Sequence, residues 1–201
     1  EVGALLILDE VISLRLGLGG AQALHGIDPD LTAMAKIIGG GFPVGAIGGK
    51  SEVMAVFSAE HGDRAAVPSG GTYTANPVTM TAGYACMRQL DESSFERLDY
   101  IGNKIRSGLD DVFESLSLDW HTTGAGSLFR IHPHGRRINS YRDAHLDSDE
   151  SAVMQSLQHR LIEREVYFSS YGMGCMNLAT SDRDVDHFLD AMKGSLEVLR
   201  G

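Results

Sequence analysis

Short apolar runs separated by glycines fill the first ninety residues, and they predict strands. Residues 4–8 form an unbroken apolar run that Asp9 and Glu10 follow directly. This run predicts a strand buried on both faces of a parallel sheet, with the two acids at its carboxyl end. Residues 44–49 predict another interior strand. Ligands of open α/β sheets bind at the carboxyl ends of strands, so Asp9 and Glu10 are candidates for a site.

The same part of the chain also predicts two helices. Residues 51–57 fit a short helix, and a small, polar loop occupies residues 68–76. Pro77 then predicts the start of a helix that runs to about Leu90, because proline is favoured at the first helical position.

Near Asp91 the pattern changes to apolar residues at helical spacing. Ser93 and Glu96 match a capping box, and the periodic positions that follow predict a helix to Leu116. Residues 127–132 predict a strand, and residues 133–148 predict an exposed polar loop.

The last fifty residues continue this mixed pattern. Val153, Leu157 and Leu161 mark a second helix, and Ser181 with Asp184 resembles another capping box before a third. Residues 166–168 and 177–179 predict short strands around a Gly-Met-Gly turn. The sequence thus predicts an α/β part over residues 1–90 and a compact α+β unit over 91–201.

Composition sets the broad class of the protein. The chain has 201 residues, 43% hydrophobic and 22% charged, which is typical of a globular protein and excludes disorder. The longest strongly apolar run has five residues, whereas a membrane helix needs about 20. The chain begins at Glu1 and reaches a strand almost at once, so we expect further residues before it.

Charge and cysteine content narrow the partners and the compartment. The net charge is −10, which disfavours nucleic acid as a partner. Residues 1–90 carry eight acids and five bases, against nineteen and twelve in residues 91–201, so the second part has the more acidic exterior. Only two cysteines, Cys86 and Cys175, are present, and we expect both to be packed and reduced in the cytoplasm.

Lys36 is the lysine with the most unusual surroundings. Its neighbours are Met34, Ala35, Ile37 and Ile38, and three glycines follow. Desolvation favours a neutral amine, which can attack a carbonyl and form a Schiff base. The alternative is a lysine whose stem lies along a partly buried element while its charge reaches solvent.

Other candidates also have two interpretations. Asp9 and Glu10 either hold a cationic partner or end the strand as solvent-facing or helix-capping acids. Residues 70–77 place a hydroxyl and amide groups before a helix, which suits a phosphate but also an ordinary capped loop. His132 and His134 suggest a metal only weakly, because no acid or cysteine lies at ligand spacing. The glycine-rich segments fail the nucleotide motifs.

Six motifs occur in an order that resembles a known family. They are Leu6–Val11, Gly19–Gln22, Pro29–Leu31, Lys36–Gly41, Pro43–Ala46 and Gly71–Pro77. The chain resembles the C-terminal portion of the class III aminotransferases, which depend on pyridoxal 5'-phosphate and have fold type I. Within them it is most similar to glutamate-1-semialdehyde 2,1-aminomutase and related aminotransferases.

The resemblance implies roles for four residues. Lys36 would form the Schiff base with the cofactor and move a proton during the reaction. Asp9 would pair with the pyridine nitrogen, and Val11 would pack on the ring. Thr72 would reach the cofactor phosphate of a neighbouring subunit, because the family's active sites lie at the interface of a homodimer.

It also implies a domain division and a reaction. Residues 1–90 would complete the large cofactor domain, and residues 91–201 would form the small C-terminal domain. The enzyme would move an amino group between an amino acid or amine and a carbonyl acceptor. The alternative within the family is the aminomutase reaction, an intramolecular amino transfer that serves tetrapyrrole synthesis. A catalytically silent fragment is a further alternative, since the family's upstream half is absent and the chain alone is expected to bind cofactor poorly.

Two departures from the family bear on this choice. The segment Glu10–Arg15 is one residue shorter than in typical aminomutases, and Ser169–Asn177 lacks an acidic residue expected there in aminomutases. Both departures favour an aminotransferase.

Overall fold

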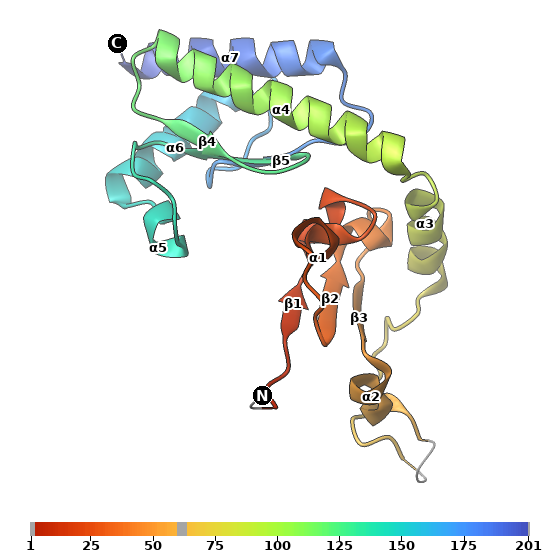
Figure 1. Ribbon diagram of the computed structural model, residues 1–201. Helices are drawn as coiled ribbons and strands as arrows, with labels where there is room; N and C mark the ends of the chain where they lie inside the picture. The colour runs from red at the N-terminus through yellow and green to blue at the C-terminus, as the bar shows by residue number, and fades with distance from the viewer. Residues whose placement is uncertain (1–2, 60–63, 201) are drawn as a thin grey trace. The chain divides into compact units, whose positions relative to one another are not determined.

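The computed structural model describes residues 3–59 and 64–200 of the chain (Figure 1). The chain divides into two compact units, Glu1–Phe95 and Glu96–Gly201, and each contains helices and a three-stranded sheet. The predicted mixed α/β architecture is confirmed.

The sheet of the first unit has the order β1-β2-β3. Its strands are β1 (Ile7–Asp9), β2 (Leu31–Ala35) and β3 (Gly45–Gly49). β1 pairs with β2 in parallel, with Ile7 opposite Leu31, and β3 runs antiparallel to β2. Both predicted strands exist, but β3 lies at an edge of this sheet rather than in its interior.

Helical segments lie between these strands and after the last of them. They are η1 (Ser13–Leu16), α1 (Gly20–His25), η2 (Lys36–Gly39), α2 (Ser51–Met54), η3 (Ala55–Phe57) and α3 (Pro77–Met87). The helix predicted at Pro77 is confirmed. Asn76 caps it, since its side-chain oxygen accepts hydrogen bonds from the amides of Val78 (3.0 Å) and Thr79 (3.2 Å).

The apolar run at residues 4–8 is not buried in this chain. Leu5, Leu6 and Ile7 are each about half exposed or more, and the strand is shorter than the run predicts. The prediction of burial on both faces is therefore wrong here, because no described element covers these side chains.

The second unit combines three long helices with an antiparallel sheet of order β4-β5-β6 (Figure 1). Its strands are β4 (His121–Thr123), β5 (Leu128–His132) and β6 (Met173–Cys175). Its helices are α4 (Glu92–Ser115), which begins in the first unit, α5 (Tyr141–Ala144), α6 (Ser148–Glu163) and α7 (Asp182–Arg200).

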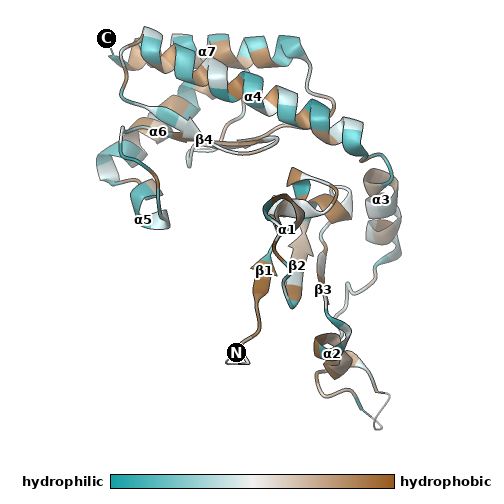
Figure 2. Cartoon of the chain, viewed as in Figure 1, coloured by the Kyte–Doolittle hydropathy of each residue, from teal (hydrophilic) through white to brown (hydrophobic). Residues whose placement is uncertain are grey.

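An apolar core lies between these helices and the sheet. Apolar and polar residues alternate along α4 and α7 (Figure 2), and most of the apolar positions are buried, although Tyr100 and Val198 are exposed. The fully buried members include Ile101, Leu109, Ile131, Leu157 and Met192. Helical spacing thus correctly predicted the inward face of α4, whereas Val153 of α6 is exposed and Met154 takes its place in the core.

Side chains fix the starts of these helices. The capping box predicted at Ser93 is wrong: Asp91 caps α4 and accepts a hydrogen bond from the Ser94 amide (2.8 Å). The box at Ser181 and Asp184 is confirmed, with the Ser181 amide donating to the Asp184 carboxylate (2.8 Å). Asp147 and Glu150 form a further capping box at α6.

Three smaller predictions about this unit need correction. Residues 166–168 and 177–179 are not strands. The strand β6 (Met173–Cys175) lies instead on the Gly-Met-Gly segment that was predicted to be a turn. The segment 133–148 contains the short helix α5 and the buried residues His134 and Ala144, so it is only partly an exposed loop. Cys175 is exposed, whereas Cys86 is partly buried, and both are free thiols.

The described residues contain neither a membrane-spanning helix nor a metal-binding cluster. No described helix is long and apolar enough to cross a membrane. Residues 3–59 and 64–200 contain no group of three His, Cys, Asp or Glu side chains arranged to hold a metal ion.

Candidate active site

The parallel pair β1 and β2 places two candidate residues at one edge of the sheet. Asp9 is the last residue of β1 and lies opposite Ala33 of β2. Lys36 directly follows the last residue of β2. Because parallel strands end at the same edge, the carboxylate and the amine share the edge at which α/β proteins bind ligands.

Lys36 has an uncommon backbone conformation. Its φ is +51°, in the left-handed region that non-glycine residues adopt rarely and at a cost of roughly 1–3 kcal/mol. The strained residue turns the chain from β2 into the 3-10 helix η2 (Lys36–Gly39). Ala75, Ser117 and Glu165 have a similar positive φ, so the conformation is consistent with a special role for Lys36 but does not assign one by itself.

The amine of Lys36 is free of partners among the residues described. Lys50 pairs with Asp30 (2.9 Å) and Lys104 with Asp186 (2.9 Å), but no described carboxylate pairs with Lys36. The side chain is exposed, so the predicted desolvation of Lys36 is wrong for this chain. Apolar neighbours in the sequence do not bury Lys36, because the turn at this position directs its side chain to solvent.

Helix α3 holds the turn that carries Lys36. A Cβ atom at Gly83 of α3 would collide with the carbonyl oxygen of Ile38, and one at Gly40 would collide with the carbonyl of Ala82. Glycine at these two positions therefore lets the backbones of α3 and the turn touch directly. The position of Lys36 is set by contact between main chains.

The two acids after β1 have different roles. Asp9 is exposed, and its carboxylate accepts a hydrogen bond from the amide of Val11 (2.9 Å). Glu10 is fully buried and caps α1, accepting hydrogen bonds from the amides of Ala21 (3.2 Å) and Gln22 (2.7 Å). The helix-capping interpretation thus holds for Glu10, while Asp9 remains available to a ligand.

Val11 and Thr72 lie in irregular segments beside these elements. Val11 is half-buried in the turn after β1. Thr72 is exposed in a turn in which the Thr74 amide donates to the Gly71 carbonyl (3.0 Å). Asn76 occupies two of the amides at the start of α3, so that helix start is an ordinary capped one. The neighbouring residues Tyr73 and Thr74 line a hollow of about 450 Å³ together with Pro43 and Val44.

These residues fit pyridoxal phosphate in the chemistry of their side chains. A free primary amine and a carboxylate share one sheet edge, and the described residues show no ion pair between them. Both groups therefore remain available, the amine to an aldehyde and the carboxylate to a ring nitrogen. Val11 and Thr72 would supply an apolar contact and a hydroxyl.

Known proteins match both the sequence and the structure. Residues 1–194 match the family Aminotransferase class-III. The glutamate-1-semialdehyde 2,1-aminomutase of Methanothermobacter thermautotrophicus is 34% identical over 202 residues, which cover 100% of this chain and 46% of that protein.

Solved structures agree with the sequence match. An ω-transaminase from Sphaerobacter thermophilus superimposes with a TM-score of 0.95 and 44% identity, covering 99% of this chain and 45% of that one. A transaminase solved with PLP bound has a TM-score of 0.87 and 34% identity, over 98% of this chain and 45% of its own. The chain therefore spans about half the length of the relatives it matches, and it belongs to the class III aminotransferases.

Proposed function

We propose that this chain is the part of a pyridoxal-phosphate-dependent aminotransferase that carries the reactive lysine. The reaction moves an amino group between an amino acid or amine and a carbonyl acceptor. The observation that carries the proposal is the pairing of β1 with β2, which brings Asp9 and the strained Lys36 to one sheet edge. The cysteine pattern suggests that the reaction takes place in the cytoplasm.

Each residue would have a defined task toward the cofactor. Bound pyridoxal phosphate supplies an electron sink for the carbanion that amino transfer creates. Lys36 would bind the aldehyde carbon through its amine and then move a proton at the substrate Cα. Asp9 would keep a proton on the pyridine nitrogen, Val11 would pack on the ring, and Thr72 would bind the phosphate of a partner subunit in a homodimer.

Borohydride reduction tests the central residue. The protein, at the length that its gene encodes, is incubated with pyridoxal phosphate, reduced and mapped by peptide mass spectrometry. We expect the cofactor mass on Lys36. Lys193→Arg, which changes an exposed lysine of α7, should leave the tag unchanged, and Lys36→Arg should remove it. A tag on another lysine would contradict the proposal.

Kinetics test the carboxylate. Asp9→Asn should lower the rate of amino transfer about 10- to 100-fold, the effect of weakening one hydrogen bond to a charged group. Glu52→Gln, which changes an exposed acid of α2, is the matched control and should leave the rate unchanged. Equal rates for Asp9→Asn and the unaltered protein would remove Asp9 from the site.

The aminomutase reaction is the second candidate, and the 34% identity to a named aminomutase supports it. The 44% identity to an ω-transaminase supports the first candidate more strongly. Incubation with glutamate-1-semialdehyde separates them. Isomerised product in the absence of an added amino acceptor would favour the aminomutase. If the gene encodes only these 201 residues, absence of any turnover would favour a silent fragment.

A further inference from the structure

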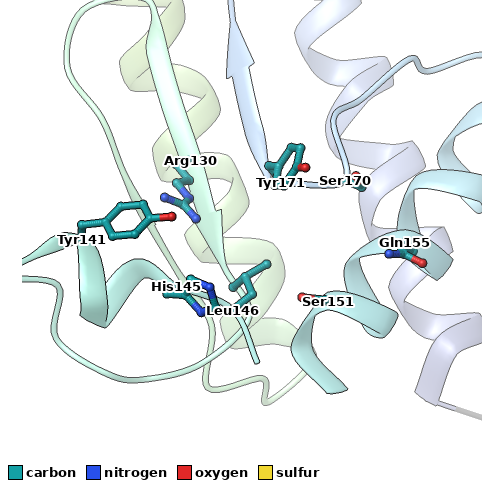
Figure 3. Close-up of a pocket in the computed structure, with 8 residues that line it drawn as sticks. All are labelled: Arg130, Tyr141, His145, Leu146, Ser151, Gln155, Ser170 and Tyr171. Carbon is teal, nitrogen blue, oxygen red and sulfur yellow. The ribbon is translucent and has the colours of Figure 1, made fainter. Parts of the chain in front are cut away.

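A small polar pocket lies entirely within the second unit (Figure 3). Its volume is about 210 Å³, and it opens between β5, α5, the start of α6 and the turn before β6. Eight residues line it: Arg130, Tyr141, His145, Leu146, Ser151, Gln155, Ser170 and Tyr171.

Strand alternation directs Arg130 into this pocket. Phe129 and Ile131, its neighbours on β5, are buried in the apolar core, so the side chain between them emerges from the opposite face of the sheet. Figure 3 shows its guanidinium on the strand, with Tyr141 and His145 on the side of α5.

The guanidinium of Arg130 is only partly satisfied. One terminal nitrogen donates to the carbonyl oxygen of Ala144 (2.7 Å), while the buried Nε has no hydrogen-bond partner. Among the described residues, no carboxylate forms an ion pair with it. A half-buried cation without a counter-charge costs free energy, so the position favours an anion.

Two arginines of the same unit do pair with an acid, whereas Arg106, like Arg130, donates to backbone carbonyls. Arg136 binds Glu150 through both terminal nitrogens and thereby lowers the pKa of Glu150 to about 2. Arg97 pairs with Asp182 (3.6 Å). Arg130 has no such acid, although acids outnumber bases in the chain by ten.

The remaining lining groups are also suited to an anion. Serine and tyrosine hydroxyls and an amide can donate hydrogen bonds, and the lining contains no aspartate or glutamate. Helix α6 adds no free amides from its second and third residues, because Asp147 accepts their hydrogen bonds. Arg130 is thus the only charge in the lining that is fixed at neutral pH.

We propose that this pocket binds the carboxylate of a small organic acid, with the guanidinium of Arg130 as its anchor. The planar guanidinium matches a carboxylate in a two-bond arrangement. Liquid water occupies about 30 Å³ per molecule, so the volume holds an acid of roughly seven non-hydrogen atoms. Tyr141, Tyr171 and Leu146 provide apolar surface for its hydrocarbon part.

The proposal does not depend on the cofactor or on Lys36, and its test keeps the two apart. The 201-residue chain is titrated with butyrate, with the uncharged isostere butyramide and with inorganic phosphate, and binding is followed by amide chemical shifts and calorimetry. We expect shifts in β5 and α5 with butyrate, and binding at least 10-fold weaker with butyramide. Lys36→Ala should bind butyrate as the unaltered chain does.

Variants of Arg130 decide the site. Arg130→Gln should weaken butyrate binding about 10- to 100-fold, as expected for loss of a charged hydrogen-bond donor. Arg142→Gln removes the same charge from α5 beside the pocket and should bind normally. If Arg130→Gln does not fold, Arg130→Lys keeps the charge without the planar donor pair and should weaken binding by a smaller factor.

Several outcomes would overturn the proposal. They are no butyrate binding to the folded chain, equal binding of butyramide, and tighter binding of phosphate. Loss of binding in Lys36→Ala would place the carboxylate at the other unit, and unchanged binding in Arg130→Gln would remove the anchor.

Discussion

The two units differ in what they bury. In the second unit, most of the described buried side chains are apolar, from Leu98 to Leu196, and the buried polar ones are Ser127, His132, His134 and Ser195. In the first unit, the buried residues among those described are Glu10, Thr32, Thr79 and three glycines, while Leu6, Ile7 and Ile47 are exposed. The second unit is therefore stabilised mainly by the hydrophobic effect, and the first by hydrogen bonds and close contact between backbones.

This difference corresponds to a division of roles. Exposed apolar surface is typical of regions that other surfaces cover, and the first unit combines such surface with the strained Lys36. In the second unit, the described buried apolar side chains form one cluster whose members all belong to that unit. We therefore expect sensitivity to core mutations to be concentrated in the second unit.

The largest expected effect is the truncation of a core side chain. Leu109 of α4 is fully buried, so Leu109→Ala should lower the free energy of unfolding by about 2–5 kcal/mol. Ile7→Ala, at a position 62% exposed, should cost less than about 0.5 kcal/mol. Hydrogen exchange of α4 and β2 amides measures each unit separately, and equal losses would refute the comparison.

The next effect is a pH dependence of the second unit. Burial, together with the charges of His121, Arg130, His134 and Arg136, lowers the pKa of His132 to about 4. Between pH 6.5 and 4 the unfolded chain binds a proton at this residue that the folded chain does not. The free energy of unfolding should therefore fall by about 3 kcal/mol from this residue as the pH drops through that window.

His132→Gln should remove most of this dependence, because glutamine has no proton to gain. Urea unfolding followed by the fluorescence of Trp120, which packs on Phe113 (5.5 Å between ring centres), provides the measurement. His159→Gln, at an exposed position of α6, should keep the full dependence. Identical pH profiles for the two variants would contradict the prediction.

A smaller effect is expected from the polar interior of the first unit. Glu10→Gln replaces an oxygen that accepts amide hydrogen bonds with a donor, at a cost of about 1–3 kcal/mol. Faster hydrogen exchange at Ala21 and Gln22 would report it. Glu52→Gln, on the exposed side of α2, serves as control, and unchanged exchange in Glu10→Gln would show that the cap contributes little.

The sequence predicted those features that depend on neighbours within a few residues. The Pro77 helix, the Ser181 cap and the inward face of α4 are decided locally by capping groups and by helical spacing. The cap of α4 was predicted at Ser93 instead of Asp91 because both residue types are good caps and they lie two positions apart.

Burial was harder to predict, because it depends on surfaces distant in sequence. Residues 5–7 and Lys36 are exposed because no described element packs over them. The local sequence does not specify which elements pack there. Asp9 and Lys36 each follow or end a strand, and they lie at the same edge of the sheet only because β1 and β2 are parallel. The sequence does not show the direction of this pairing. The sequence did not indicate a role for Arg130, because a single charged residue on a short strand is typical of a solvent-facing position.

The close contact between Gly83 of α3 and the carbonyl oxygen of Ile38 makes the position of the turn that carries Lys36 depend on α3. A single methyl group at position 83 would leave the identity of every site residue unchanged and would still displace the turn that carries Lys36. The reactivity of the amine is therefore open to retuning by a substitution forty-seven positions away along the chain, without any change in the residues that would perform the chemistry.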